Sequence, residues 1–468
     1  MKTRREHDLL GELDIPAGAY YGIQTYRGMQ NFQLTGKKLK DYPDFVKGMA
    51  VVKQGAALAN HELGLLDEKI CQAIVKACEE IRAGEYLDEF PVDMIQGGAG
   101  TSTNMNANEV IANRALEILG HKKGEYDFCH PNNHVNMAQS TNDAYPCGAR
   151  LGIVFGNERL ICEIKNLVES FRKKANEMGN HIKIGRTQLQ DAVPMTYYQE
   201  FESYAATIEA EVKKFSELEK NLYVLNMGAT AIGTGINADP AYAKTVVKHL
   251  SKVTGLPIST AKNLIAATND TSDFVSYSGQ LKRLALKLTK ICNDLRLLSS
   301  GPRTGFAEIK LPPRQPGSSI MPGKVNPVIP EAMNQIAFKV IGNDLTVTLG
   351  SENGQLELNV FEPVMIYSIF DSVQLLINGM KMLRIECVDG IEGNYEHGRD
   401  LVYNSISLVT ALNPIIGYEA SSSIAKAALE EGRSVYDLVL ERKLLDKASL
   451  DKLLRPENMT KPHHLKKK

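Results

Sequence analysis

The sequence predicts a mainly α-helical protein organised around a central bundle of long helices. In residues 274–298, apolar side chains recur at alternating steps of three and four, which places them on one face of a single long helix. Residues 201–225 and 151–171 repeat this periodicity. The first two helices would each be roughly 40 Å long at about 1.5 Å per residue. No alternation of strands and helices interrupts the series, so the long helices are expected to pack as a bundle.

Three domains are predicted around this bundle. Residues 1–140 form a mixed N-terminal domain with helices at residues 45–62 and 68–83, and Cys71 and Cys78 of the second helix are expected to face the core. The bundle occupies residues 141–396, and Ser-Ser-Gly-Pro at residues 299–302 ends its clearest helix. Residues 397–468 form a small helical domain, whose last six residues, HHLKKK, are predicted to be a solvated tail.

The composition is that of a soluble globular protein. Of 468 residues, 43% are hydrophobic and 23% are charged, and the net charge of -1 gives no electrostatic footprint for nucleic acid or an anionic membrane. The seven cysteines include no C-x-x-C pair, which argues against a disulfide framework and a cysteine zinc cluster. Neither a signal peptide nor an apolar run long enough to span a bilayer is present. The sequence therefore predicts a cytoplasmic protein.

The densest chemistry lies in residues 317–327, which read GSSIMPGKVNP. Two serines, a lysine and an asparagine stand between glycines and prolines, as in a loop that closes over a small anion. The segment has no neighbouring His or Asp that would favour a hydrolase triad. It also differs from a phosphate-binding loop, because Val325 stands where Ser or Thr would hold magnesium. Taken alone, the segment is more typical of a surface turn.

Three further segments are rich in small hydrogen-bonding residues. They read GGAGTSTNMNANE at residues 97–109, STND at residues 140–143 after PNNHVNMAQ, and GRTQLQD at residues 185–191. Each alone is typical of a helix cap or a turn. Together with one lysine, their hydroxyls and amides suit a small dicarboxylate. His130 and His134 have helical spacing but lack a third ligand, so we expect loop histidines there and no metal site.

These segments carry a family resemblance. GSSIMPGKVNP resembles the signature of the fumarase/aspartase superfamily, and the similarity extends from AYYGIQT at residues 19–25, through GTSTNMNANEV and QSTNDAYP, to GQLELNVFEPV at residues 354–364. The resemblance implies an enzyme with a mainly α fold of three domains and a central bundle of long helices. It also implies a homotetramer whose sites are shared by three subunits. Members eliminate a group from the β-position of a dicarboxylate to give fumarate.

The leaving group is indicated by positions that vary within the superfamily. Gln188 stands where members that release water usually carry His, and an amide cannot relay protons. Thr141 and Tyr21 also resemble the members that release ammonia. The resemblance therefore implies reversible deamination of L-aspartate to fumarate and ammonia. Two alternatives stay open, namely a class II fumarase acting on L-malate and a non-catalytic structural homologue.

The resemblance also implies a role for each site residue. Ser318 would be the general base that removes the Cβ proton and creates an aci-carboxylate, and Lys324 would assist it. The β-carboxylate would be held by Thr101, Ser140, Thr141 and Ser319. The α-carboxylate would be held by Thr187, Lys324 and Asn326, and the amino group would face Asn142 and Gln188. This scheme requires no cofactor and no metal ligands, while activation by Mg²⁺ stays open.

Overall fold

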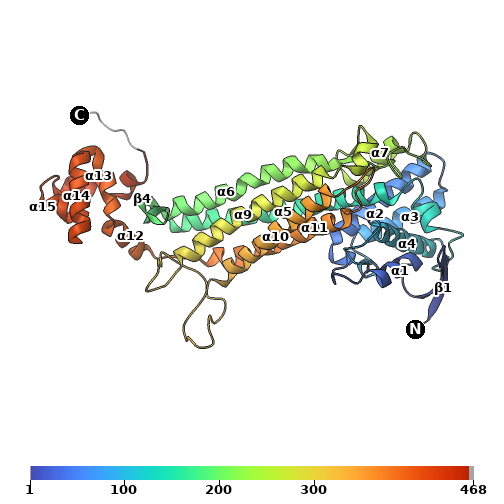
Figure 1. Ribbon diagram of the computed structural model, residues 1–468, viewed down its shortest axis with the longest axis horizontal. Helices are drawn as coiled ribbons and strands as arrows, with labels where there is room; N and C mark the ends of the chain where they lie inside the picture. Colours follow the sequence, from blue (N-terminus) through green and yellow to red (C-terminus); the bar gives the residue numbers. More distant parts are fainter. Residues whose placement is uncertain (1, 463–468) are drawn as a thin grey trace. The chain divides into compact units, whose positions relative to one another are not determined.

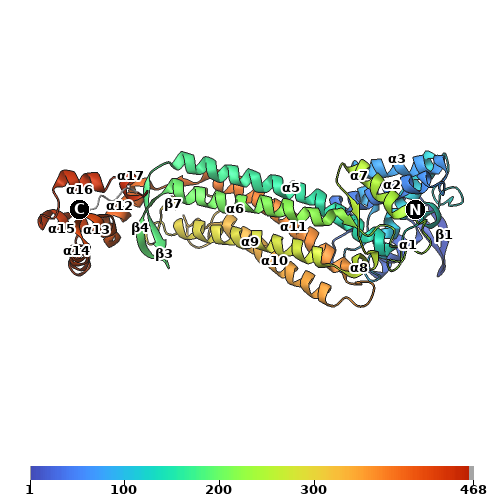
Figure 2. The same cartoon turned by 90° about the horizontal axis from the view of Figure 1, so that it is seen from above.

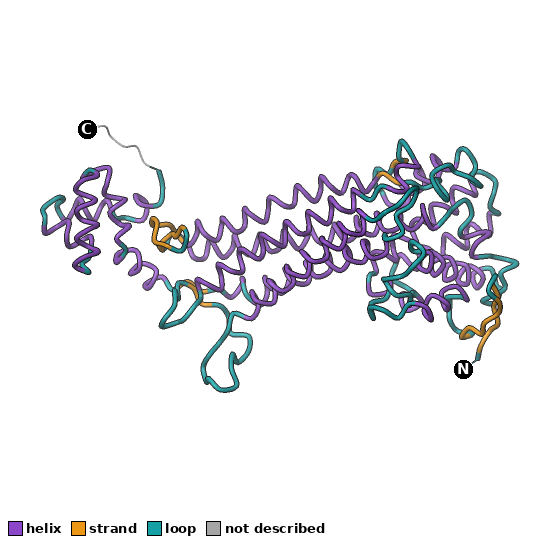
Figure 3. Tube along the Cα trace, in the orientation of Figure 1, coloured by secondary structure: helices purple, strands orange, loops and turns teal. Residues whose placement is uncertain are grey.

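The computed structural model describes residues 2–462, so the predicted tail at residues 463–468 lies outside the described residues. Helices dominate the described chain, and its strands occur only in two-stranded pairs (Figure 3). The chain divides into two compact units, each assembled from separate segments. Unit 1 comprises Met1–Cys162, Lys213–Ala285 and Phe338–Ile377, and unit 2 comprises Glu163–Val212, Leu286–Ala337 and Asn378–Lys468. The three-domain division stays a prediction, since these units are defined by packing.

Five long helices contribute one end to each unit, and they confirm the predicted mainly α fold. They are α5 (Thr141–Met178), α6 (Tyr197–Glu219), α9 (Ser272–Leu298), α10 (Val328–Glu352) and α11 (Glu362–Glu386). Within both units their segments run side by side (Figures 1 and 2). All eight apolar residues of the predicted stripe on α9 are buried, namely Phe274, Tyr277, Leu281, Leu284, Leu288, Ile291, Leu295 and Leu298. This helix ends at Leu298, directly before the predicted stop.

Two long helices differ from their predicted bounds. The helix predicted at residues 201–225 ends at Glu219, and a 3-10 turn and a short strand follow, although Leu222 and Leu225 remain buried. The helix predicted from residue 151 begins ten residues earlier, at Thr141, and contains Pro146. Because proline has no N–H, the carbonyl of Asn142 lacks its helical donor. The side-chain amide of Asn226 donates to that carbonyl instead, over 3.2 Å.

In unit 1, shorter helices surround the ends of the long ones. The chain begins with the antiparallel pair β1 (Thr3–Asp8) and β2 (Gly11–Pro16), followed by α1 (Ile23–Asn31), α2 (Pro43–Glu62), α3 (Glu68–Arg82) and α4 (Thr101–Ile118). Later segments add β5 (Val224–Leu225), α7 (Tyr242–Thr254), β6 (Ser259–Thr260) and α8 (Leu264–Asn269). The helices predicted at residues 45–62 and 68–83 are confirmed as α2 and α3. Cys71 and Cys78 are buried, as predicted.

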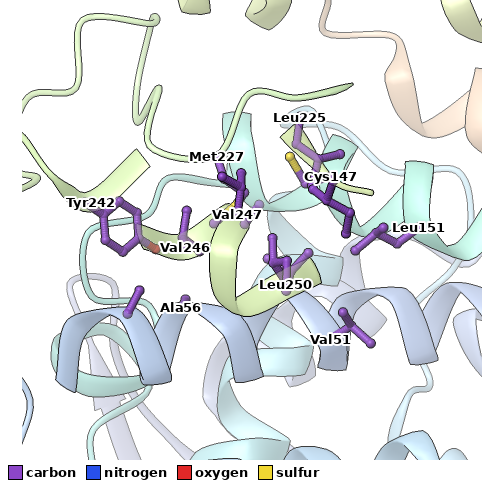
Figure 4. Close-up of a cluster of buried hydrophobic side chains, with 14 of the residues drawn as sticks. Val51, Ala56, Cys147, Leu151, Leu225, Met227, Tyr242, Val246, Val247 and Leu250 are labelled. Carbon is purple, nitrogen blue, oxygen red and sulfur yellow. The ribbon is translucent and has the colours of Figure 1, made fainter. Parts of the chain in front are cut away.

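The core of unit 1 joins three helices. Side chains of α2, α5 and α7 meet there, among them Val51, Leu151 and Leu250 (Figure 4). The helices approach closely because glycines replace side chains where they cross. A Cβ atom on Gly48 of α2 would lie 2.1 Å from the carbonyl oxygen of Gly148 on α5. This close crossing positions the first turns of α5, which carry predicted site residues.

Unit 2 contains a hairpin, a short strand pair and the C-terminal helices. The hairpin is β3 (Ile182–Thr187) with β4 (Gln190–Thr196), and the second pair is β7 (Ile309–Lys310) with β8 (Glu392–Gly393). The helices are α12 (Tyr395–Asn404), α13 (Val409–Ile416), α14 (Tyr418–Glu431), α15 (Val435–Glu441), α16 (Lys447–Leu453) and α17 (Pro456–Met459). Ile182 and Ile184 of β3 pack into the core of these helices. Between residues 2 and 462, no helix is both long and apolar enough to cross a membrane.

Candidate active site

The lysine-bearing loop, residues 317–327, leads into α10 and is closed at its base. The N–H of Gly317 donates to the carbonyl of Lys324 over 2.7 Å, and the side-chain amide of Asn326 donates to the carbonyl of Gly317 over 2.9 Å. Gly317 has no room for a side chain, because a Cβ atom would lie 2.3 Å from the Lys324 oxygen. Beyond this base the tip is exposed, with Ile320 at 84%. The loop is therefore a projecting flap on a tight stem.

Ser318 and Ser319 lie at the start of the flap. Ser318 is half-buried, and its Oγ accepts hydrogen bonds from the backbone N–H groups of Ile320 and Met321, over 3.2 and 3.1 Å. Two donors at one oxygen favour its negatively charged form. Ser319 is exposed. A cleft of about 710 Å³ runs beside the stem and is lined by Lys324 and Asn326, with Lys310 and the end of α9.

The Ser-Thr-Asn segment forms the first turn of α5 in unit 1. The N–H of Ser140 donates to Asp143 over 2.9 Å, and the buried Asp143 also accepts from the N–H groups of Gly228 and Thr230. Burial raises the pKa of Asp143 to about 6. The amide nitrogen of Asn142 donates to the carbonyl of Ala231 over 2.7 Å. These hydrogen bonds fix the turn. The side-chain carbonyl oxygen of Asn142 remains available to accept a hydrogen bond from a ligand.

A buried lysine behind this turn was missed by the sequence analysis. The ammonium of Lys53 on α2 donates to Asn104 over 2.7 Å, to Asn136 over 2.9 Å and to Gln139 over 2.8 Å. Burial lowers the pKa of Lys53 to about 7. The amide nitrogen of Asn104 in turn donates to the hydroxyl of Thr141 over 3.3 Å, which leaves that hydroxyl free to donate. The amide-rich segments, which the sequence analysis interpreted as helix caps or turns, were the available signal. Several amide oxygens gathered in one place need a buried donor such as Lys53.

Thr101 is the first residue of α4, one turn before Asn104, and its side chain is exposed. Its hydroxyl donates to the carbonyl of Gly98 over 2.7 Å. Gly100 before it has φ of 93°, and a Cβ there would lie 2.4 Å from the ring of Tyr145. The first turns of α4 and α5 are thus joined through Asn104 and Thr141. Both helix ends present N–H groups, which favour bound anions.

Thr187 and Gln188 lie at the tip of the hairpin β3–β4 in unit 2. Gln188 and Leu189 have φ of 54° and 62°, the left-handed pair that a two-residue type I′ turn requires. Asn and Gly are the usual residues there, so a turn made by Gln and Leu is strained. Strain of this kind concentrates at functional sites. The side chains of Thr187 and Gln188 are exposed.

His130 and His134 make hydrogen bonds to the backbone of their own segment. The ring nitrogen of His134 accepts the N–H of His130 over 2.8 Å, and that of His130 accepts the N–H groups of Asn132 and Asn133. Within the part of the chain that the structure describes, no cluster of three or more His, Cys, Asp or Glu residues could hold a metal.

The predicted site residues thus form three local groups. Unit 1 brings together Thr101, Ser140, Thr141 and Asn142. Unit 2 carries the hairpin group, Thr187 and Gln188, and the flap group, Ser318, Ser319, Lys324 and Asn326. No hydrogen bond among residues 2–462 joins the hairpin group directly to the flap group.

Comparison with known proteins gives the family. A family model described as Lyase matches residues 11–342, and a model of the fumarase C C-terminus matches residues 408–461. The chain belongs to the fumarase/aspartase family. An aspartate ammonia-lyase of Pseudomonas aeruginosa is 59% identical over 461 residues, which cover 98% of this chain and 97% of the relative. The match to this curated relative shows that the chain is a carbon–nitrogen lyase.

Two solved structures of the fumarase/aspartase family share the fold. The first, described as fumarate lyase:delta crystallin from Brucella melitensis bound to cobalt, has a TM-score of 0.95 and 51% identity, and covers 98% of this chain and 100% of its own. The second, a class II fumarase from Schistosoma mansoni, has a TM-score of 0.91 but 33% identity, and covers 99% and 100%. The predicted fold class and lyase family are therefore confirmed.

Proposed function

We propose that this protein is a cytoplasmic aspartate ammonia-lyase, which converts L-aspartate reversibly into fumarate and ammonia. The observation that carries the proposal is the nearly full-length identity of 59% to an aspartate ammonia-lyase, against 33% to a class II fumarase of the same fold. Gln188 supports the same choice, because its amide can accept a hydrogen bond from an ammonium group but cannot relay a proton to or from water.

In the proposed mechanism Ser318 is the general base. Its alkoxide takes a proton from Cβ, and the electron pair of that C–H bond moves into the β-carboxylate to give a dianionic aci-carboxylate. When the Cα–N bond breaks, the pair returns to form the double bond of fumarate, and the nitrogen leaves as ammonia. The two N–H groups at Ser318 Oγ support this role, since hydrogen bonds to an alkoxide lower the pKa of the hydroxyl. No step uses a cofactor.

The local geometry supports the proposed substrate contacts. The Thr141 hydroxyl, which accepts from Asn104, is free to donate to the β-carboxylate together with Ser140 and Ser319. The exposed Thr101 hydroxyl would exchange its hydrogen bond to the Gly98 carbonyl for one to the same carboxylate. Asn142 is fixed with its carbonyl oxygen available to the ammonium group of the substrate. Lys324 and Asn326 line the same cleft and would hold the α-carboxylate with Thr187.

We also propose a homotetramer in which three subunits complete each site. An apolar face on α10 supports an assembly, because Phe338, Leu345 and Leu349 are 59%, 59% and 50% exposed at helical spacing. Sedimentation should give four chains, and Leu345→Glu should lower that number. Mixed refolding of inactive Ser318→Ala and Thr141→Ala chains should recover activity if subunits share sites. No recovery from folded hybrids would contradict shared sites.

One assay tests the reaction. Fumarate formation should be followed by ultraviolet absorbance with L-aspartate and, separately, with L-malate, with and without a chelator and added Mg²⁺. Activity on aspartate alone is expected. Activity on malate alone would reverse the assignment, and silence on both would favour a structural role. Loss of activity with the chelator, restored by Mg²⁺, would show that the reaction requires a metal ion, which the proposed scheme does not include.

Ser318→Ala tests the base. Its turnover should fall by about 100- to 10,000-fold, the usual loss for a general base, with an unchanged circular dichroism spectrum. The matched control is Ser319→Ala on the same flap, which removes a carboxylate contact and leaves the base. Isotope exchange distinguishes the two variants. With L-aspartate deuterated at Cβ, the Ser319→Ala variant should still exchange the deuterium with solvent, whereas the Ser318→Ala variant should not. Near-normal turnover by Ser318→Ala would refute the assignment.

A further inference from the structure

A chain of four alternating charges includes two residues of β3, a strand of the hairpin that carries Thr187 and Gln188. Glu200 of α6 pairs with Lys183 of β3 over 2.9 Å, and Lys183 pairs with Glu308 over 3.0 Å. Glu308 also pairs with Arg186, the residue directly before Thr187. The side chains of Glu308 and Lys183 are 0% and 2% exposed. Two cations and two carboxylates leave no net charge, which lowers the free-energy cost of burying Glu308 and Lys183.

Glu308 is also fixed through its backbone. Its N–H donates to the carbonyl of Leu298 at the end of α9 over 2.9 Å. Its carbonyl accepts from the N–H of Asn394 over 2.8 Å and from the hydroxyl of Tyr197 over 2.9 Å. The backbone of Glu308 is thus held from three segments, and its carboxylate is directed by the ion pairs to Lys183 and Arg186. Arg186 is held on its other side by the ring of Phe306, with its guanidinium 4.2 Å from the ring centre.

This position links two groups of predicted site residues. Glu308 stands directly before β7, and Lys310 of β7 lines the cleft shared with Lys324 and Asn326. Through Arg186, the same residue reaches the strand that ends at Thr187, in the hairpin β3–β4 (Figure 2). The hairpin group and the flap group make no direct hydrogen bond among the described residues. The Glu308–Arg186 ion pair is thus a connection between the strand of one group and the cleft of the other.

We propose that Glu308 is a positioning residue for the α-carboxylate end of the substrate, which Thr187 beside Arg186 would contact. It holds Arg186, and with it the strained turn at Gln188, in register with the cleft beside the flap. The inference rests on the proposed deamination of L-aspartate. The α-carboxylate keeps its charge throughout that reaction, so its contacts stabilise the ground state and the transition state alike. Loss of their alignment should therefore raise KM more than it lowers kcat.

Glu308→Asp tests this role and Glu200→Gln is the matched control. The aspartate keeps the buried charge but is one methylene shorter, so it cannot span Lys183 and Arg186 as Glu308 does. The control breaks the same ion chain at its far end and leaves the Glu308–Arg186 pair in place. We expect KM for L-aspartate to rise about tenfold in Glu308→Asp with kcat within about threefold, and both constants to stay within about twofold in Glu200→Gln.

Hydrogen exchange provides a readout that does not depend on activity. Exchange in the peptide that spans residues 185–191 should be at least about tenfold faster in Glu308→Asp than in the wild type, and unchanged in Glu200→Gln. Arg186→Lys, which loses the planar fork but keeps the charge, should reproduce both effects if Glu308→Asp fails to fold. Normal exchange, or faster exchange with an unchanged KM, would overturn the proposal. A wild type that forms no fumarate from aspartate would refute the proposed function, while the exchange data would still test the connection.

Discussion

Gly48→Ala should destabilise the protein strongly, although alanine is the better helix former. The new Cβ would lie 2.1 Å from the carbonyl oxygen of Gly148, 2.8 Å from the nitrogen of Gly152 and 3.1 Å from the carbonyl carbon of Gly148. All three atoms belong to the backbone of α5, so no side-chain rotation can relieve the contact. The two helices must move apart by roughly an ångström, since non-bonded carbon atoms pack at about 3.5–4.0 Å.

The magnitude follows from two opposing terms. Helix propensity favours alanine over glycine by about 1 kcal/mol in a helix interior. Overpacking of a tight core costs about 1–3 kcal/mol when side chains can adjust, and this contact against backbone should reach or exceed the upper end. The net loss should be at least about 2 kcal/mol in the free energy of unfolding. Activity should fall as well, because α2 also carries Lys53 behind the first turn of α5.

Gly156→Ala on α5 is the matched control for this substitution. Its Cβ would meet only side-chain atoms, Val373 Cγ1 at 3.3 Å and Asp44 Oδ2 at 3.4 Å, and these can yield by a few tenths of an ångström. Its stability should stay within about 1 kcal/mol of the wild type. Urea denaturation followed by circular dichroism measures both variants. The packing argument fails if Gly48→Ala is as stable as Gly156→Ala.

Three other variants test the flap and the buried charges. Gly317→Ala should reduce fumarate formation with little change in the urea midpoint, because its Cβ would force open the stem at Lys324 while the flap itself is exposed. Burial raises the pKa of Glu109 to about 7, so the folded state binds more protons than the unfolded state between about pH 4.5 and 7. Stability should therefore fall as pH rises through that window, and Glu109→Gln should remove up to about 3 kcal/mol of this dependence in urea titrations. Burial lowers the pKa of Lys53 to about 7, so the folded state binds fewer protons above that pH and stability should rise by about 2 kcal/mol between pH 7 and 9, a rise that Lys53→Met should lack.

The helices were predictable where one physical rule acts alone. On α9 burial follows sequence spacing residue by residue, because each turn packs its apolar face against the same neighbours. The predicted end of α6 was wrong because Leu222 and Leu225 are buried although they lie beyond the helix, in the 3-10 turn and the short strand that follow. The spacing of apolar residues does not distinguish a helix from a following segment that buries the same side chains. The start of α5 was missed because Pro146 resembles a helix stop. The compensating donor, Asn226, is distant in sequence.

The candidate site was predictable only in part, for a related reason. The residue types suited to a small dicarboxylate can be read from short segments, as with Ser318, Thr141 and Gln188. Residues that hold those side chains in place act through long-range contacts, so no local pattern marks them. Lys53 lies 51 positions from Asn104, and Glu308 lies more than 100 positions from Arg186. A single lysine or glutamate in a helix or loop is usually a solvated surface residue, and only burial distinguishes these two.

The distribution of charge among the site groups fits the proposed elimination better than a uniformly cationic site would. In unit 1 the groups that would meet the β-carboxylate are neutral hydroxyls at the first turns of α4 and α5, where helix N–H groups add partial positive charge. The β-carboxylate gains charge only as the Cβ proton leaves, so oriented dipoles stabilise that step more than they stabilise bound substrate. The full charge of Lys324 belongs to the flap, and in the proposed scheme it would meet the α-carboxylate, whose charge does not change. An arrangement with the lysine at the β-carboxylate would bind aspartate more tightly, with less of that binding energy reserved for the transition state.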